Sequence, residues 1–177
     1  YMEVYGIAAS LGSRLKWPDD YFVLYHELSW QQYKLKDWDY SFLFANGKSN
    51  NLSYKITLTR NSTDQPVYPR NGSDFTFGVQ LTPPYSAFRS GDTDYKNMVD
   101  SEKYKWIEYH KWTFKSATYT KLVGDLVIKT SADFGYLGYY NKNLGYSPFE
   151  GFQLGGDGMS GYNTYGSDII GLRGYPN

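Results

Sequence analysis

The stretch Leu-Ser-Tyr-Lys-Ile-Thr-Leu-Thr at residues 52–59 decides the fold class. Its apolar side chains fall on every second position and its polar side chains on the positions between them, which is the period of a β-strand whose two faces meet different surroundings. Residues 75–82 repeat the pattern, with Phe, Phe, Val and Leu against Thr, Gly, Gln and Thr. Two prolines and an Asn-Gly pair at 64–72 mark a turn between the two stretches. The sequence therefore predicts two strands separated by a turn.

The same alternation continues along the chain in both directions, at residues 7–14, 22–31, 110–115 and 126–135. We expect about six strands of roughly ten residues each, with no helix between them. The connections alternate between short turns and long loops, so the short ones share one end of the strands and the long ones the other. The short turns are at 18–20, 64–73 and 123–125, and the long loops at 37–50, 85–104 and 141–177.

A soluble β-sandwich and a membrane β-barrel both alternate in this way. The connections favour a barrel, because outer-membrane barrels have short periplasmic turns and long external loops. Aromatic residues near strand ends are typical of the girdles at the membrane interfaces: Trp17, Trp30, Trp38, Trp106, Tyr136, Tyr139 and Tyr140. The predicted fold class is therefore all-β, an antiparallel transmembrane β-barrel. It would turn positions 52, 54, 56, 58, 75, 77, 79 and 81 to lipid, and 55, 57, 76 and 80 to the lumen. A soluble, Tyr- and Trp-rich carbohydrate-binding β-sandwich is the alternative.

Composition argues against several classes of protein. The 177 residues include 18 Lys and Arg against 18 Asp and Glu, so the chain lacks the positive charge typical of nucleic-acid binding. Cysteine is absent, which rules out disulfides and thiolate metal sites. No apolar run approaches the roughly 18 to 20 residues of a membrane helix. The strand pattern is already under way at Tyr1, so we expect a piece of a longer chain.

An enzyme finds little support in the sequence. His26 and His110 are the only histidines, and the motifs of nucleophilic serine, phosphate-binding and zinc sites are missing. We expect both histidines to lie at membrane interfaces rather than to bind metal. Asp157 and Asp168 stand among glycines, but the regular ligand spacing of a calcium loop is missing. The sequence therefore predicts no catalytic residue, no metal site and no cofactor.

The run from Phe149 to Asn177 carries glycine at 151, 155, 156, 158, 161, 166, 171 and 174. These glycines leave no room for a long helix or a regular strand, so the run is predicted to be a loop. It also carries apolar side chains that a solvated linker would not need, namely Phe149, Phe152, Leu154, Ile169, Ile170, Leu172 and Tyr175. We therefore expect the loop to fold onto an interior wall, with Arg173 as its one fixed cation.

Several of these stretches resemble the BamA-type outer-membrane assembly proteins of Bacteroidota. Residues 58–64, 68–72 and 81–84 are similar to a strand, a periplasmic turn and a strand of that family. Phe149-Glu150-Gly151-Phe152 and Leu154-Gly155-Gly156, followed by Leu172-Arg173-Gly174-Tyr175, resemble the family's sixth extracellular loop with its (V/I/L)-R-G-(F/Y) signature. The spacing between Gly156 and Arg173 is longer than in the proteobacterial pattern.

The resemblance implies a barrel of about 16 strands, of which residues 1–140 would supply roughly the sixth to the eleventh. Residues 141–177 would be the external loop that folds into the lumen. Leu172, Arg173, Gly174 and Tyr175 would form its functional motif, and Phe149, Phe152, Gly155 and Gly156 would support it. Arg173 would be buried, and because an unpaired buried charge is costly, carboxylates on strands beyond Asn177 would meet it.

The implied function is assembly: a factor of the cell outer membrane that folds and inserts β-barrel proteins. Its partners would be client β-barrel proteins, accessory lipoproteins of an assembly complex and outer-membrane lipid. A related pore that exports a single partner polypeptide shares the loop signature and is the alternative within membrane proteins.

Overall fold

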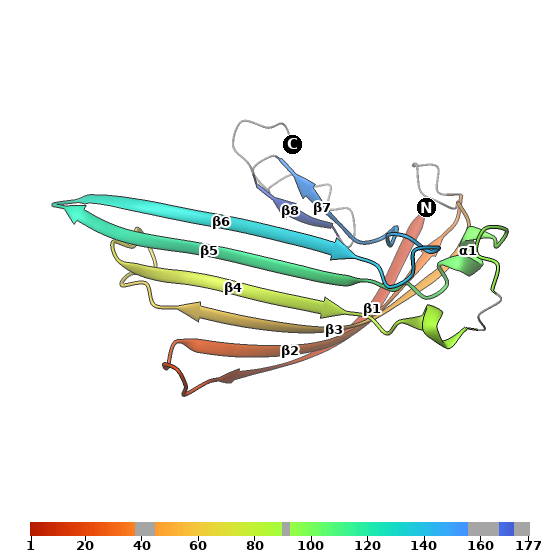
Figure 1. The fold of residues 1–177 in the computed structure, drawn as a ribbon, viewed down its shortest axis with the longest axis horizontal. Coiled ribbons are helices and arrows are strands. Elements are labelled where there is room, and N and C mark those ends of the chain that lie inside the picture. The colour runs from red at the N-terminus through yellow and green to blue at the C-terminus, as the bar shows by residue number, and fades with distance from the viewer. Residues whose placement is uncertain (38–44, 90–92, 156–166, 172–177) are drawn as a thin grey trace.

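The computed structural model describes residues 1–37, 45–89, 93–155 and 167–171 (Figure 1). Six strands form one antiparallel sheet in which each strand pairs with the next along the chain. They are β1 (Met2–Arg14), β2 (Phe22–Leu35), β3 (Gly47–Asn61), β4 (Gly72–Leu81), β5 (His110–Val123) and β6 (Leu126–Gly138). The predicted all-β class and the six strands are confirmed. A β-sandwich would need a facing sheet of comparable size, and the second sheet in the described ranges has two strands.

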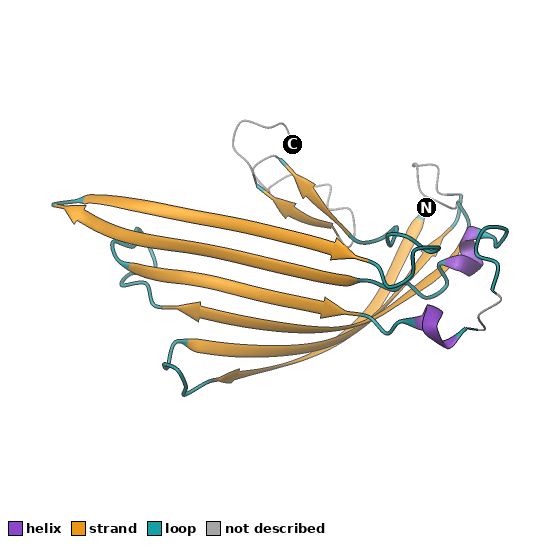
Figure 2. Cartoon of the chain, viewed as in Figure 1, coloured by secondary structure: helices purple, strands orange, loops and turns teal. Residues whose placement is uncertain are grey.

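Two short helices lie in the connection between β4 and β5, where no helix was predicted (Figure 2). They are the 3₁₀-helix η1 (Tyr85–Phe88) and the α-helix α1 (Asp100–Lys103). The prediction was wrong because a helix of four residues is too short to show a 3.6-residue period. No helix in the described part of the chain is long and apolar enough to cross a membrane.

The glycine-rich run contains two short strands, β7 (Gly151–Leu154) and β8 (Ser167–Ile170), which pair in parallel. The prediction that glycine excludes a regular strand here was therefore wrong. The glycines are spaced widely enough to leave four-residue windows, and the apolar residues between them favour extended backbone. In Figure 1 the pair lies beyond β6, and the Phe152 ring of β7 packs on Gly135 of that strand.

The register gives the sheet two different faces. On one, Leu24, Leu58, Phe77, Phe114 and Phe134 lie in a row across five strands. On the other face, the adjacent residue of each strand forms a row of Tyr25, Thr57, Gly78, Thr113 and Gly135. The β7/β8 pair lies on the second, polar face, where Phe152 and Ile170 line a cavity of about 240 Å³ together with Lys55, Thr57 and Thr76.

The short turns are fixed by local hydrogen bonds. Asp64 accepts the backbone N–H groups of Arg70 and Asn71 at 2.9 and 3.1 Å, and these bonds lower the pKa of its carboxyl. Gly72 follows with φ of 103°, and a Cβ there would lie 2.2 Å from the carbonyl oxygen of Ser62, so only glycine fits. The Asn71-Gly72 signal thus reflects a real steric requirement.

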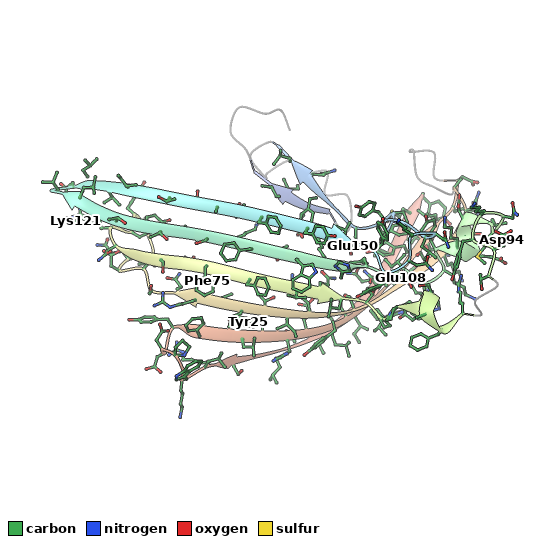
Figure 3. The ribbon with its side chains drawn as sticks, in the orientation of Figure 1. Tyr25, Phe75, Asp94, Glu108, Lys121 and Glu150 are labelled. Carbon is green, nitrogen blue, oxygen red and sulfur yellow. The ribbon has the colours of Figure 1, made fainter. Side chains whose placement is uncertain are left out.

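The buried core lies at the long-loop end of the sheet. It consists of Tyr33, Leu35, Tyr104, Ile107, Tyr109 and Phe149. The Tyr104 hydroxyl donates to the carbonyl oxygen of Leu144 at 2.9 Å, so the β4–β5 connection is tied to the chain that follows β6. In Figure 3 the side chains crowd together at this end, around Glu108 and Glu150. The start of the glycine-rich run is therefore held in packed structure.

Candidate functional site

Phe149 fixes the start of the glycine-rich run to the sheet. Its side chain is 1% exposed, and its ring stacks on that of Tyr33 in β2 with centroids 4.4 Å apart and planes 9° from parallel. Stacked aromatic rings at this separation contribute beyond the area that they bury. The position predicted to support the loop is thus a buried aromatic contact.

Glu150, the next residue, enters a buried polar network. Its Oε1 accepts hydrogen bonds from the Tyr109 hydroxyl at 3.0 Å and from Asn51 Nδ2 at 3.3 Å. Its Oε2 accepts one from Lys111 Nζ at 3.1 Å. The carboxylate thus receives donors from β3, from β5 and from the residue just before β5. Figure 3 shows it beside the long-loop end of the sheet.

Lys111 of β5 links the β7/β8 pair to the large sheet. Its side chain is 5% exposed, and Nζ lies 3.1 Å from Glu150 Oε2 and 2.9 Å from Asp168 Oδ2. Glu150 immediately precedes β7 and Asp168 lies in β8, so one ammonium bridges two carboxylates of the glycine-rich run. Nζ also lies 5.0 Å from the centre of the Phe152 ring, within the range of a cation–π contact. We call Lys111, Glu150 and Asp168 the loop anchor.

Burial sets the electrostatics of this anchor. It raises the pKa of the Glu150 carboxyl above the ordinary value, and the positive charge and hydrogen bond of Lys111 oppose that shift. Burial also raises the pKa of Tyr109 strongly, so that its hydroxyl stays protonated and can donate to Glu150. Lys111 and the neutral donors therefore offset part of the cost of burying this carboxyl group.

The network continues across the sheet away from the anchor. Gln80 Nε2 donates to the Tyr109 hydroxyl at 2.7 Å and to Ser53 Oγ at 3.0 Å, and Ser53 Oγ lies 2.9 Å from Ser29 Oγ. Polar side chains of β2, β3 and β4 are thereby coupled to the loop anchor. Such satisfied networks are rigid, because each group depends on its neighbours for its hydrogen bonds.

Phe152 lies on a seat made by glycine. A Cβ at Gly135 of β6 would lie 2.6 Å from the Phe152 ring, so any side chain there would displace it. Gly155 has φ of 132° and donates its N–H to the carbonyl oxygen of Ile170 at 3.0 Å. Phe149, Phe152 and Gly155 are thus each held in place, by Tyr33, Gly135 and Ile170 respectively. Gly156 and the motif of Leu172, Arg173, Gly174 and Tyr175 lie outside the described residues.

The sequence reading missed Glu150, Lys111, Tyr109 and Asn51 as site residues. One signal was available, because Glu150 is the only charged residue between Lys142 and Asp157 and has Phe149 beside it. Of the two aspartates weighed for calcium, Asp168 pairs with Lys111, and Asp157 lies outside the described residues. Within the described ranges, no group of three or more His, Asp or Glu could hold a metal ion.

The histidines lie apart from the anchor, on the other face of the sheet. His26 Nδ1 is 2.7 Å from the Tyr54 hydroxyl, and His110 Nδ1 accepts the indole N–H of Trp112 at 2.9 Å. Each polar ring is thus hydrogen-bonded to an aromatic neighbour on the apolar face.

An antiparallel sheet with one apolar face, one polar face and a loop anchored on the polar face fits the wall of a membrane β-barrel. The Omp85 superfamily domain matches residues 2–171, and the chain therefore belongs to the Omp85 superfamily. Omp85 proteins are β-barrels of the outer membrane that insert or translocate proteins. A search of curated protein sequences gave no match.

Proposed function

We propose that the chain is a central part of the barrel of an outer-membrane assembly factor of the BamA type, which folds and inserts other β-barrel proteins. The loop anchor carries the proposal. A buried lysine that holds both arms of the glycine-rich run against the polar face fits a loop kept inside the lumen. The Omp85 match supports a role in protein insertion or translocation.

The proposed mechanism uses strand pairing rather than a catalytic residue or a nucleotide. Backbone groups without partners are costly in lipid, so an incoming strand gains most where another strand edge is offered to it. The six-stranded sheet and its anchored loop would hold the barrel rigid while a seam elsewhere opens. The partners would be client β-barrel proteins and accessory lipoproteins, and the location the cell outer membrane.

Depletion of the full-length protein tests this proposal. We expect the levels of many outer-membrane β-barrel proteins to fall together, as measured by quantitative proteomics of purified outer membranes. Loss of a single exported polypeptide, with the barrel proteins unchanged, would instead identify the pore that serves one partner. Re-expression of the wild-type protein is the control, because it should restore the lost proteins.

Arg173 offers a second test of the proposed loop motif. We expect Arg173→Ala in the full-length protein to lower client insertion, because carboxylates on other strands would lose their partner. Arg173→Lys should restore only part of the activity, since lysine lacks the planar fork of arginine. Lys142 is exposed and lies earlier in the same connection, so Lys142→Ala is the matched control. Equal insertion by the Arg173→Ala and Lys142→Ala variants would remove Arg173 from the motif.

A further inference from the structure

The apolar face of the sheet carries a groove over β4, β5 and β6. Its volume is about 430 Å³, and six of its seven lining residues carry a ring: Phe77, His110, Trp112, Phe114, Phe134 and Tyr136. The register places three of these rings in one row and Trp112 beside Tyr136 in the next. Phe134 remains 61% exposed, so the rings border the groove without filling it.

His110 closes the groove at the end near the long loops. Its ring lies 5.8 Å from that of Tyr136 and 5.4 Å from that of Tyr140, which follows β6. A Cβ at Gly138 would lie 2.2 Å from the imidazole, so this glycine gives the ring its place. His110 is the first residue of β5, and the groove therefore runs from the external end of the strands toward their middle.

The His110 imidazole also carries a hydrogen-bond donor at Nε2. Because Nδ1 accepts the indole N–H of Trp112, the proton of the neutral ring lies on Nε2. Among the residues that the structure describes, no acceptor is bonded to Nε2. The site thus combines a ring-lined channel with one hydrogen-bond donor at its external end.

We propose that this groove binds one acyl chain of an outer-leaflet glycolipid of the lipid A class, with His110 Nε2 donating to an ester or phosphate oxygen of the same lipid. The face is continuous with the surface that an outer-membrane barrel turns to lipid, which indicates a lipid occupant. The external position selects the outer leaflet, where lipid A is the main lipid. The proposal requires only an Omp85 barrel and is independent of the insertase function.

Native mass spectrometry of the full-length protein, purified from outer membranes in mild detergent, tests this site. We expect retained lipid A on the wild type and about tenfold less on Phe134→Ala, a loss that corresponds to about 1.4 kcal/mol. His110→Phe keeps the ring and removes the donor, so its retention should fall between the two. Leu28→Ala is the control outside the groove, because Leu28 is exposed on the same face and in register with His110, three strands away. Its retention should equal that of the wild type.

Retention is normalised to folded barrel, measured by heat-modifiable migration, so a poorly folding variant cannot imitate lost binding. A second measurement uses the conservative variant Trp112→Phe. The fluorescence that this change removes is the signal of Trp112, and lipid A with brominated acyl chains should quench it more than brominated phosphatidylethanolamine. Equal retention by Phe134→Ala and Leu28→Ala, or equal quenching by the two lipids, would overturn the proposal.

Discussion

Lys111→Met in the full-length protein should destabilise the barrel by about 3 to 5 kcal/mol, as expected when one member of a buried ion pair is removed. The substitution keeps much of the side-chain volume and removes the charge. Glu150, whose side chain is 5% exposed, would lose its only charged partner in the described residues, and Asp168 would be released to water. Urea titration of the protein folded into lipid vesicles measures the loss.

Three further variants separate the ion pair from general effects. Lys115→Met is the control, since Lys115 lies two positions further along the polar face of β5 but is exposed, and it should change stability little. Glu150→Gln should be mild, because Lys111 keeps Asp168 at 2.9 Å. The double variant Lys111→Met/Glu150→Gln should be more stable than Lys111→Met alone, since no buried charge is left unpaired. A double variant no better than Lys111→Met would contradict the anchor.

The pH dependence of Lys111→Met follows from Glu150. Burial already raises the pKa of this carboxyl in the folded protein, and loss of the lysine charge must raise it further. A group whose folded pKa lies above its unfolded value favours the folded state below the unfolded pKa, and this contribution is lost as the pH rises through the folded pKa. The difference in free energy of unfolding between Lys111→Met and the wild type should therefore become smaller as the pH is lowered. If this difference did not depend on pH, the lost stability would not come from the unpaired Glu150 carboxylate.

The fold was predictable because its signal is local. Alternation such as that of residues 52–59 depends only on which face of a strand each side chain occupies. It can therefore be recognised in the sequence of one strand, even when the partner strand is unknown. Five of the six strands are longer than the predicted ten residues, up to 15 in β3, because they extend past the apolar band into the loops. Helix α1 escaped prediction because four residues carry no period.

The site was predictable only in part, because its pairings depend on register. The glycine pattern and the aromatic residues pointed to the loop base, where Phe149, Phe152 and Gly155 lie. Glu150 and Lys111 are 39 residues apart, and they meet only because the chain after β6 returns to the polar face of β5. A lone lysine on an alternating strand gives no sign of whether it will be buried. The contact between Gly135 and Phe152 could not be predicted from the sequence either, because the two residues lie on different strands, β6 and β7.

The assignment of the two faces makes a last prediction, that Ile56→Arg should cost far more stability than Thr57→Arg. Ile56 lies in the apolar row between His26 and Val79, on the face that carries the ring-lined groove. On the lipid face of a barrel an arginine near the midplane costs about 2 to 4 kcal/mol. Thr57 borders the cavity of about 240 Å³ on the polar face, where a guanidinium can stay hydrated. Urea titration in vesicles compares the two, with Ile56→Leu as the control for shape.

Because adjacent residues of one strand sit at nearly the same depth, depth cannot explain the difference. Equal losses of stability in the two variants would mean that the face carrying β7 and β8 does not line the lumen. The loop anchor would then not lie inside the barrel.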